Sequence, residues 1–382
     1  MKTVRLGIIG IGTMGRFHLS KLGEIKNIEL TAVCDLDPER GRQAAATYHC
    51  AAYEDHRKLL KDQVCDAVLI VTPHYAHTTI GIDALRAGLH VLVEKPISVH
   101  KSDCERLIAA HTNRKQIFAA MFNQRTDPRY RKLRQLVQDG TLGKLDRITW
   151  IITDWFRTDA YYASSDWRAT WGGEGGGVLL NQCPHNLDLW QWMFGMPQRV
   201  RAFCNLGRKH NIEVEDEVTA YLGYDSGCSG VFITSTGEAP GTNRLEVAAE
   251  HGKVIIEGNG IRFTRNEQSV NTFLKTTPDL WSRPDVWNVE IPTSGTGGQH
   301  AEIIQNFINA IVEKTPLVAP AAEGIRSVEL GNAMLYSSET GKTVEMPLNG
   351  KAYERMLKHK IKTSRFIKKT KATKLGDISR SY

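Results

Sequence analysis

The chain has 382 residues, of which 41% are hydrophobic and 24% charged, a balance typical of a globular protein with two domains. The apolar runs have the length of strands and are broken by glycine or charge, so we expect no membrane span, no signal peptide and a cytoplasmic location. Eight Lys or Arg residues between Lys358 and Lys374 outweigh the whole net charge of +7, so the remainder is close to neutral.

Residues 4–9 form an apolar run that ends at a glycine fingerprint. The sequence is Gly10-Ile11-Gly12-Thr13-Met14-Gly15, a GxGxxG motif between a predicted strand and a predicted helix. Gly10 permits a tight turn, Gly12 lets the backbone approach a pyrophosphate, and Gly15 lets the helix pack on its strand. The motif predicts a dinucleotide site that includes Thr13 and Met14.

A second predicted strand, residues 29–34, ends at Asp35, which lies 20 residues after Gly15. A carboxylate at this place can bind the ribose hydroxyls and repels a 2′-phosphate, so NAD is favoured over NADP. The nearby cation Arg40 keeps NADP as the alternative cofactor. The alternative interpretation is that Asp35 caps the helix that begins near Pro38, a role that Asp37 can also fill.

Alternating strands and helices continue to about residue 125 and predict a doubly wound parallel sheet, a Rossmann domain over residues 1–125. The further strands are expected at 66–71, 90–93 and 117–122, and the helices at 37–47, 54–61, 76–87 and 100–114. Ligands of such sheets bind outside the carboxyl ends of the strands. The residues expected there, facing the cofactor, are Thr72, Pro73, His77, Glu94, Lys95 and Asn123.

Residues 126–345 change to alternating patterns that predict a mainly antiparallel open sheet with helices on one face. Strands are expected at 145–155, 217–224, 228–236, 244–250 and 253–257, and helices at 128–139, 184–194, 300–314 and 323–340. Exposed strand faces suggest a homodimer or homotetramer.

Gly175 to Asp188 form a second cluster, in which glycines lead into a predicted helix. Asn181, His185 and Asp188 are spaced to share one helix face if the helical phase extends back to residue 181. A histidine can serve as a general base here, or it can be a structural residue paired with Asp188. Arg125, Trp167 and Arg168 are further substrate-side candidates, because flat apolar faces and hydrogen-bond donors suit a sugar ring, and the arginines suit a sugar carboxylate or phosphate.

The final segment, residues 346–382, is expected to be a basic, solvated and partly disordered extension. Contact with an acidic partner or RNA is the alternative, but no recognition motif accompanies the lysines, and we expect no nucleic-acid partner. Seven scattered cysteines without a CxxC pair, and thirteen histidines without an HxxxH or HExxH set, predict no disulfide framework and no metal.

These motifs resemble the glucose-fructose oxidoreductase, inositol dehydrogenase and rhizopine catabolism (Gfo/Idh/MocA) family over about residues 1–345. The resemblance rests on the glycine fingerprint, the segment from Ala87 to Pro96, and the segment from Gly175 to Asp188. It implies that Lys95 and His185 carry hydride-transfer chemistry on sugars and cyclic polyols. It also implies that the domain of residues 126–345 binds the substrate and mediates oligomerisation. The family often has an aspartate where this chain has Asn181, which puts in doubt any role that needs charge there.

The predicted activity is oxidation of a secondary alcohol by NAD, with removal of the hydroxyl proton while hydride leaves the same carbon. His185 is the natural base and Lys95 the hydrogen-bond donor, but a desolvated lysine can exchange these roles. Two alternative functions are also consistent with the family resemblance. One is a glycosidase that oxidises and re-reduces its substrate within a turnover, and the other is a catalytically silent NAD-binding sensor.

Overall fold

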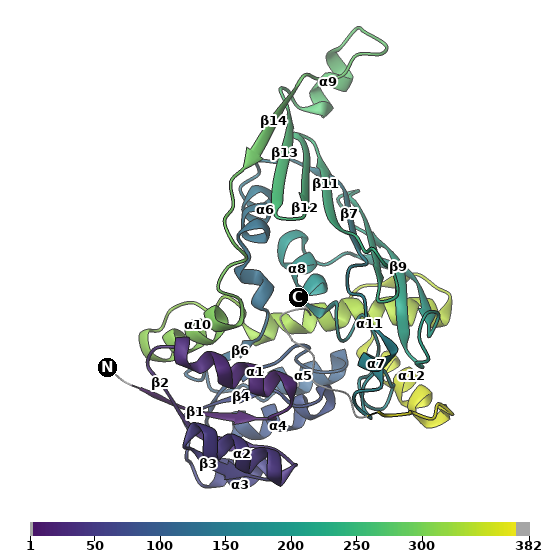
Figure 1. Ribbon diagram of the computed structural model, residues 1–382. Coiled ribbons are helices and arrows are strands. Elements are labelled where there is room, and N and C mark those ends of the chain that lie inside the picture. The colour runs from purple at the N-terminus through teal and green to yellow at the C-terminus, as the bar shows by residue number, and fades with distance from the viewer. Residues whose placement is uncertain (1–2, 372–382) are drawn as a thin grey trace.

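A six-stranded parallel sheet forms the first part of the molecule, in a computed structural model that describes residues 3–371 (Figure 1). The spatial order of its strands is β3 (Ala51–Tyr53), β2 (Ile28–Cys34), β1 (Val4–Ile9), β4 (Ala67–Ile70), β5 (His90–Val93) and β6 (Phe118–Ala120). The order changes direction between β1 and β4, which creates the crevice where Rossmann sheets bind their ligands. The predicted Rossmann sheet is confirmed.

Helices connect these strands and cover both faces of the sheet, which explains why β1, β4 and β5 are almost wholly buried. They are α1 (Thr13–Lys21), α2 (Pro38–Tyr48), α3 (His56–Lys61), α4 (His74–Arg86) and α5 (Lys101–Ala109), with 3₁₀ turns η1 (Leu22–Glu24) and η2 (Asn123–Thr126). The strand β3 was not predicted. Its three residues are too few to show a strand period.

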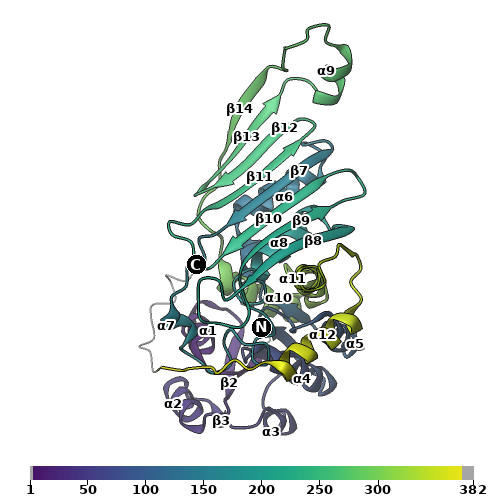
Figure 2. The same ribbon diagram turned by 90° about the vertical axis from the view of Figure 1, so that its right-hand side faces the viewer.

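A nine-stranded open sheet forms the second part, and all its neighbouring strands are antiparallel except the β7–β10 pair. The order is β14 (Val286–Ile291), β13 (Gly260–Asn266), β12 (Gly252–Glu257), β11 (Asn243–Ala249), β7 (Leu145–Ile152), β10 (Ser229–Ser235), β9 (Glu215–Gly223), β8 (Arg199–Leu206) and β15 (Val344–Glu345). The helices lie on one face of this sheet, as predicted, and the strands alone form the near face in Figure 2.

The helices of this second part are α6 (Pro128–Gln138), α7 (Asp159–Tyr162), α8 (Pro184–Phe194), α9 (Val270–Thr276), α10 (Gln299–Glu313), α11 (Gly324–Thr340) and α12 (Gly350–Thr363), with η3 (Ala321–Glu323). Strands β8, β13, β14 and β15 were not predicted. Almost every residue of β14 is exposed, so apolar and polar residues do not alternate along it as they do in a half-buried strand. Strand β15 has only two residues. With α9, β13 and β14 form an arm that projects from the molecule (Figure 1).

The described chain has two hydrophobic cores, one for each sheet, and it does not divide between them at one point. The buried face of α10 belongs to the core of the parallel sheet, through Ile303, Ile304, Phe307 and Ile308. A β-bridge between Ala119 and Pro320 adds a further contact at the β6 edge. The helix α11 then returns the chain to the second core.

The expected solvated extension is wrong for residues 350–363, which form the amphipathic helix α12. The Asn349 side chain accepts a hydrogen bond from the Ala352 amide and caps its start, and Tyr353 and Leu357 are buried four residues apart. The helix packs against α5 and α11. Residues 372–382 of the predicted extension lie outside the described residues, and none of the helices within residues 3–371 is long and apolar enough to cross a membrane.

Truncation of Leu357 to alanine should destabilise the protein by roughly 2–5 kcal/mol, because the change leaves a cavity in a packed interface. Chemical denaturation followed by tryptophan fluorescence measures the loss. Arg355→Ala on the exposed face of the same helix is the matched control and should change the midpoint little. Equal midpoints for the two variants would show that α12 contributes nothing to the fold.

Candidate functional site

The glycine loop after β1 has the shape that a dinucleotide needs. Gly10 has a φ of +98°, and a Cβ there would lie 2.6 Å from the Val71 carbonyl oxygen. A Cβ on Gly15 would lie 2.1 Å from the Gly10 oxygen, whereas one on Gly12 would meet no described atom within 4 Å. Thr13 and Met14 form the first turn of α1, whose N-cap residue, Gly12, has no side chain to occupy the first amides. The loop therefore leaves open backbone for a pyrophosphate.

Asp35 lies at the end of β2 beside this loop, in the place expected for a ribose ligand. Its Oδ2 accepts a hydrogen bond of 2.7 Å from the Ile11 amide, and its Oδ1 accepts one of 2.9 Å from the Asp37 amide. Asp37, and not Asp35, caps α2 by accepting from the Glu39 and Arg40 amides. The Arg40 guanidinium lies 3.2 Å from Asp35 and 3.2 Å from Asp37.

Two buried oxygens at the carboxyl ends of β4 and β6 have no hydrogen-bond partner within the described chain. They are Thr72 Oγ1 and Asn123 Oδ1, while the Asn123 amide donates to Gln299. Orphaned polar atoms of this kind fit a bound polar group, such as the carboxamide of a nicotinamide. Pro73 is the N-cap of α4. His77 lies one turn into α4 and joins two carbonyls, with Nε2 2.7 Å from the Thr72 oxygen and Nδ1 2.8 Å from the Pro96 oxygen.

Glu94, at the end of β5, is held by a buried histidine rather than by Lys95. His18 Nε2 lies 2.7 Å from Glu94 Oε1, and the second carboxylate oxygen accepts from the Lys95 amide. Burial alone would raise the pKa of Glu94, but the hydrogen bond and charge of His18, with smaller effects of His300 and Lys95, lower it to about 2. Within the residues described, Lys95 makes no ion pair with Glu94, and its ammonium binds a backbone carbonyl instead.

Lys95 and His185 come from different domains, and the Lys95 ammonium lies near enough for its charge to act on the His185 ring. Lys95 Nζ donates a 2.8 Å hydrogen bond to the Asn181 carbonyl oxygen, just before α8. His185 is in the first turn of α8 and is 1% exposed, and neither of its ring nitrogens has a hydrogen-bond partner among residues 3–371. Burial, and then the charges of Lys95 and His300, lower the pKa of His185 well below its usual value. The ring is therefore neutral and can accept a proton.

The groups around Lys95 act in opposite directions on the pKa of its ammonium. Burial lowers the pKa of its ammonium, the charges of Glu94 and Glu174 raise it, and those of Arg157 and Arg168 lower it. Glu174 was not singled out by sequence reasoning. A glutamate flanked by glycines matches no catalytic motif, and only the folded structure shows that it lies beside Asn181 and Arg168.

Glu174 is 1% exposed, and its carboxylate is hydrogen-bonded to residues on both sides of it in the chain. Its Oε1 accepts a hydrogen bond from the Asn181 side-chain amide, and its Oε2 accepts a 2.6 Å bond from the Ala169 amide. The Asn181 Oδ1 accepts from the Tyr161 hydroxyl at 3.1 Å. Burial raises the pKa of Glu174, against the charges and hydrogen bonds of its neighbours, of which Arg168 is the largest. A carboxylate thus lies one hydrogen bond away from the Asn181 side chain.

Trp167 and Arg168, the predicted substrate-side residues, lie near Tyr161, and the charge of Arg168 acts on Lys95. The Arg168 guanidinium lies over the Tyr161 ring at 4.3 Å and over the Trp167 ring at 4.8 Å, and it donates a 2.5 Å hydrogen bond to the Tyr161 hydroxyl. The Trp167 ring meets the buried His74 ring edge-on at 5.8 Å. Trp150 and Trp190, by contrast, are fully buried in the second core.

Arg125 and Asp188 bind each other in a buried ion pair. Two hydrogen bonds of 2.7 Å join the guanidinium to both carboxylate oxygens, and Arg125 also contacts Glu323 at 2.6 Å and the Val318 oxygen at 3.2 Å. Both partners are 1% exposed. This geometry gives the pair a role in joining η2 to α8. A part in substrate binding stays a prediction that these contacts do not support.

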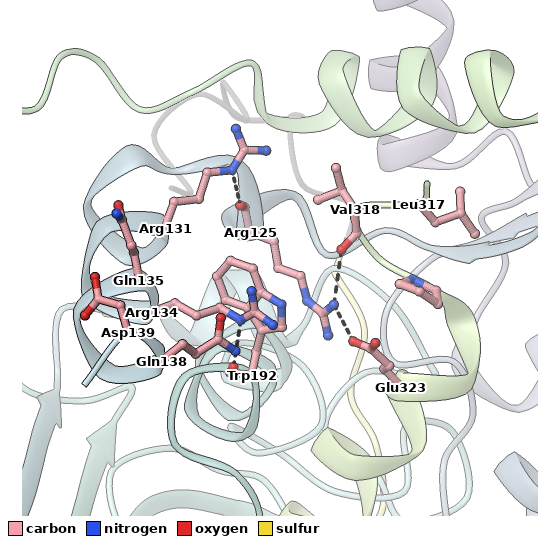
Figure 3. A pocket seen from close by; sticks show the side chains of 11 residues that line it. Arg125, Arg131, Arg134, Gln135, Gln138, Asp139, Trp192, Leu317, Val318 and Glu323 are labelled. Atoms are coloured by element: carbon pink, nitrogen blue, oxygen red, sulfur yellow. Dashed lines mark hydrogen bonds and ion pairs between the residues drawn. The ribbon is translucent and has the colours of Figure 1, made fainter. Parts of the chain in front are cut away.

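Arg125 also borders an open hollow of about 670 Å³ that involves neither Lys95 nor His185 (Figure 3). Arg131 and Arg134 enter it from α6, and the Arg134 guanidinium lies 4.5 Å from the centre of the Trp192 ring. The cations of this hollow are bound by neighbouring acids and carbonyls. No cluster of three or more His, Cys, Asp or Glu with the arrangement of a metal site occurs in residues 3–371.

The fold and the glycine loop define an NAD-binding oxidoreductase. A family model described as "Oxidoreductase family, NAD-binding Rossmann fold" matches residues 4–122, and a model of the GFO/IDH/MocA C-terminal domain matches residues 130–255. Together they cover more than half of the chain. The chain belongs to the Gfo/Idh/MocA family, which confirms the resemblance seen in the sequence.

The relatives of this chain include sugar and polyol dehydrogenases. It is 27% identical to myo-inositol 2-dehydrogenase of Thermotoga maritima over 266 residues, which are 66% of this chain and 75% of the relative. It is 26% identical to inositol 2-dehydrogenase of Rhizobium meliloti over 342 residues, 88% of this chain and 97% of the relative.

Solved structures agree with the fold. The WlbA dehydrogenase of Bordetella pertussis, crystallised with NADH and UDP-GlcNAcA, superposes with a TM-score of 0.76 at 24% identity, over 91% of this chain and 100% of that chain. A levoglucosan dehydrogenase in complex with NADH and L-sorbose gives 0.75 at 20% identity, with the same coverage.

Proposed function

We propose that this protein is an NAD-dependent dehydrogenase that moves hydride between a secondary alcohol of a sugar, glycoside or cyclic polyol and nicotinamide. The observation that carries the proposal is the buried His185 ring, whose two nitrogens have no partner among the described residues and which lies four residues after the carbonyl that binds the Lys95 ammonium. The inositol dehydrogenases among the relatives support a polyol or sugar as substrate. When bound, NAD would accept the hydride at its nicotinamide ring.

The residues that would hold NAD follow from the contacts of the first domain. The glycine loop would bind the pyrophosphate and Asp35 the ribose, while the orphaned oxygens of Thr72 and Asn123 would face the nicotinamide end. The ion pairs of Arg40 with Asp35 and Asp37 favour NAD over NADP, because this arginine is already neutralised and a 2′-phosphate would meet two carboxylates.

His185 and Lys95 divide the work on the substrate hydroxyl. The neutral His185 ring would accept the hydroxyl proton, and the Lys95 ammonium would donate a hydrogen bond to the same oxygen as negative charge develops on it. Because the pKa of His185 is lowered, the proton-accepting form persists below pH ~6.5, the usual midpoint for histidine. The acid limb of the rate profile should therefore lie below that pH.

Glu174 would supply the negative charge that Asn181 lacks. Its carboxylate binds the Asn181 amide, and its charge raises the pKa of Lys95 against the effect of burial. Glu174 would thus keep Lys95 protonated as a donor, acting as a positioning residue rather than touching the substrate.

The proposed function is tested by mixing the full-length protein with NAD or NADP and a panel of inositols, sugars, sugar acids, sugar phosphates and simple glycosides, and following NADH absorbance and glycoside cleavage. We expect NADH to accumulate, and more readily from NAD than NADPH does from NADP. Lys95→Met should lower turnover by roughly 10²–10⁴-fold while NAD binding by calorimetry is retained. Cleavage without accumulated NADH would indicate a redox-recycling glycosidase, and silence in both assays a sensor.

The role of Glu174 is tested by moving its carboxylate. Glu174→Gln should lower turnover and shift the alkaline limb of the pH profile to lower pH, since loss of this charge lowers the pKa of Lys95 further. The double variant Glu174→Gln, Asn181→Asp places a carboxylate on the neighbouring residue and should move the limb back. An unchanged alkaline limb in the single variant would contradict the assignment, and Glu54→Gln on the surface is the control.

We further propose that the chain forms a homodimer or homotetramer through the open sheet and the arm. Phe203 and Tyr221 are exposed on adjacent strands of the sheet, and Leu280 and Trp281 are 84% and 88% exposed on the arm. Light scattering should give two or four times the mass of one chain. Trp281→Ser should weaken the assembly, and a monomeric mass for the unaltered protein would refute it.

A further inference from the structure

We propose that residues 364–371, here called the C-terminal strap, hold residues 161–171, here called the substrate loop, in place for substrate binding. Lys368 of the strap acts as a positioning residue for Trp167 and Arg168, the substrate-side residues predicted from the sequence. This inference rests on the proposed function, and it gives a role to a part of the chain that the sequence predicts to be a solvated extension.

The substrate loop has little regular structure of its own. Helix α7 ends at Tyr162, and residues 163–183, all of which the structure describes, contain no helix or strand. The backbone of the loop therefore depends in part on outside partners for its hydrogen bonds and its shape. The strap and the end of α12 supply such partners at both ends of the loop.

The first anchor lies at the end of α7. Lys368 Nζ donates a 2.7 Å hydrogen bond to the Tyr162 carbonyl oxygen, and the Lys371 amide donates one of 3.0 Å to the Ala163 carbonyl oxygen. Carbonyls in the last turn of a helix have no partner within the helix, so these two donors complete the end of α7. Alternate residues of the strap, Phe366 and Lys368, are half-buried and their neighbours are exposed, as in an extended chain with one side on the protein. Figure 2 shows this part of the chain leaving α12 and crossing to α7.

The second anchor lies at Trp171, at the other end of the substrate loop. The carboxylate of Glu213, just before β9, joins the loop to the strap. Its Oε1 accepts a 2.9 Å hydrogen bond from the Trp171 amide, and its Oε2 accepts one from the Ser364 hydroxyl. In the last turn of α12, Lys360 Nζ lies 5.1 Å from the centre of the Trp171 ring. The two anchors thus enclose residues 164–170, which include both substrate-side residues.

Contacts lead from the first anchor to the proposed catalytic lysine. The carbonyl that Lys368 binds belongs to the residue after Tyr161, whose ring lies 4.3 Å from the Arg168 guanidinium and whose hydroxyl accepts a 2.5 Å hydrogen bond from it. The same hydroxyl donates to the Asn181 side chain, and the Asn181 carbonyl oxygen accepts from Lys95. A shift of α7 would therefore move the Arg168 guanidinium relative to Lys95.

The ammonium of Lys368 is half-buried and lies near charges of both signs. Burial lowers its pKa, the charge of Glu174 raises it, that of Arg168 lowers it, and that of Glu213 raises it. Its hydrogen bond goes to a backbone carbonyl, so Lys368 acts through the loop and not on the substrate. A loop that is held before the substrate arrives loses less conformational entropy on binding. Loss of this anchor should therefore weaken substrate binding more than it slows the chemical step.

Hydrogen–deuterium exchange on the full-length protein tests whether the strap holds the loop. Lys368→Met keeps the apolar stem but removes the donor, and it should increase deuterium uptake in peptides from residues 161–171. The glycine loop, residues 10–15, is the internal reference and should exchange as in the unaltered protein. The matched control is Lys369→Met, which removes the same charge from an exposed neighbouring side chain and should leave the uptake unchanged.

Steady-state kinetics with NAD test whether this hold serves substrate binding, with myo-inositol, glucose and glucuronate as the probes. For the probe that is turned over best, Lys368→Met should raise KM by about three- to tenfold, the effect of one lost charged hydrogen bond, and change kcat by less than about twofold. The Kd of NAD, measured by calorimetry, should not change. Lys368→Arg keeps a donor at this place and should restore most of the lost affinity.

Equal uptake in the unaltered protein and in Lys368→Met would overturn this inference. Increased uptake with an unchanged KM would also overturn it, because the strap would then hold the loop without serving the substrate, and the dehydrogenase proposal would stand. Absence of NADH with every compound would refute the dehydrogenase and the role of the strap in substrate binding, while the exchange measurement would still show whether the strap holds the loop.

Discussion

The hydrogen bond between Lys95 Nζ and the Asn181 carbonyl oxygen is the contact on which the candidate site depends. Lys95 stands at the end of β5 in the parallel sheet, and Asn181 lies just before α8 in the second domain. A lysine can be held in a buried place only if its ammonium finds acceptors, and this carbonyl provides one. The contact therefore sets the position of the charge relative to His185, four residues further along, and relative to the open backbone at the glycine loop.

Much of the fold could be predicted from the sequence, and the failures have physical reasons. Strands β1, β4 and β5 are continuous apolar runs because helices bury both faces, and such runs are visible without any structure. Strand β14 is exposed over nearly its whole length, so no pattern marks it. In α12, the two residues that attach the helix to the fold, Tyr353 and Leu357, stand among four lysines and one arginine, so the segment was interpreted as a basic extension.

The candidate site was predicted where a motif fixes a backbone shape, and missed where only tertiary contacts bring residues together. Spacing locates Gly10, Lys95 and His185 at strand and helix ends. Spacing also predicted that Asp188 would share a face with His185, but it could not reveal that Arg125 would occupy both of its carboxylate oxygens. Glu174 and Lys368 have no motif, since their surroundings come from segments far away in the chain.

Because α10 packs into the core of the parallel sheet, that core cannot be completed until residues 299–313 have been synthesised. The parallel sheet is built from residues before 121, yet the apolar side chains that close its core come from Gln299–Glu313. A nascent chain that has only produced β1 to β6 still lacks this cover and exposes apolar surface to water. The protein cannot complete its first domain while the second is being made, so the two must reach their final packing together.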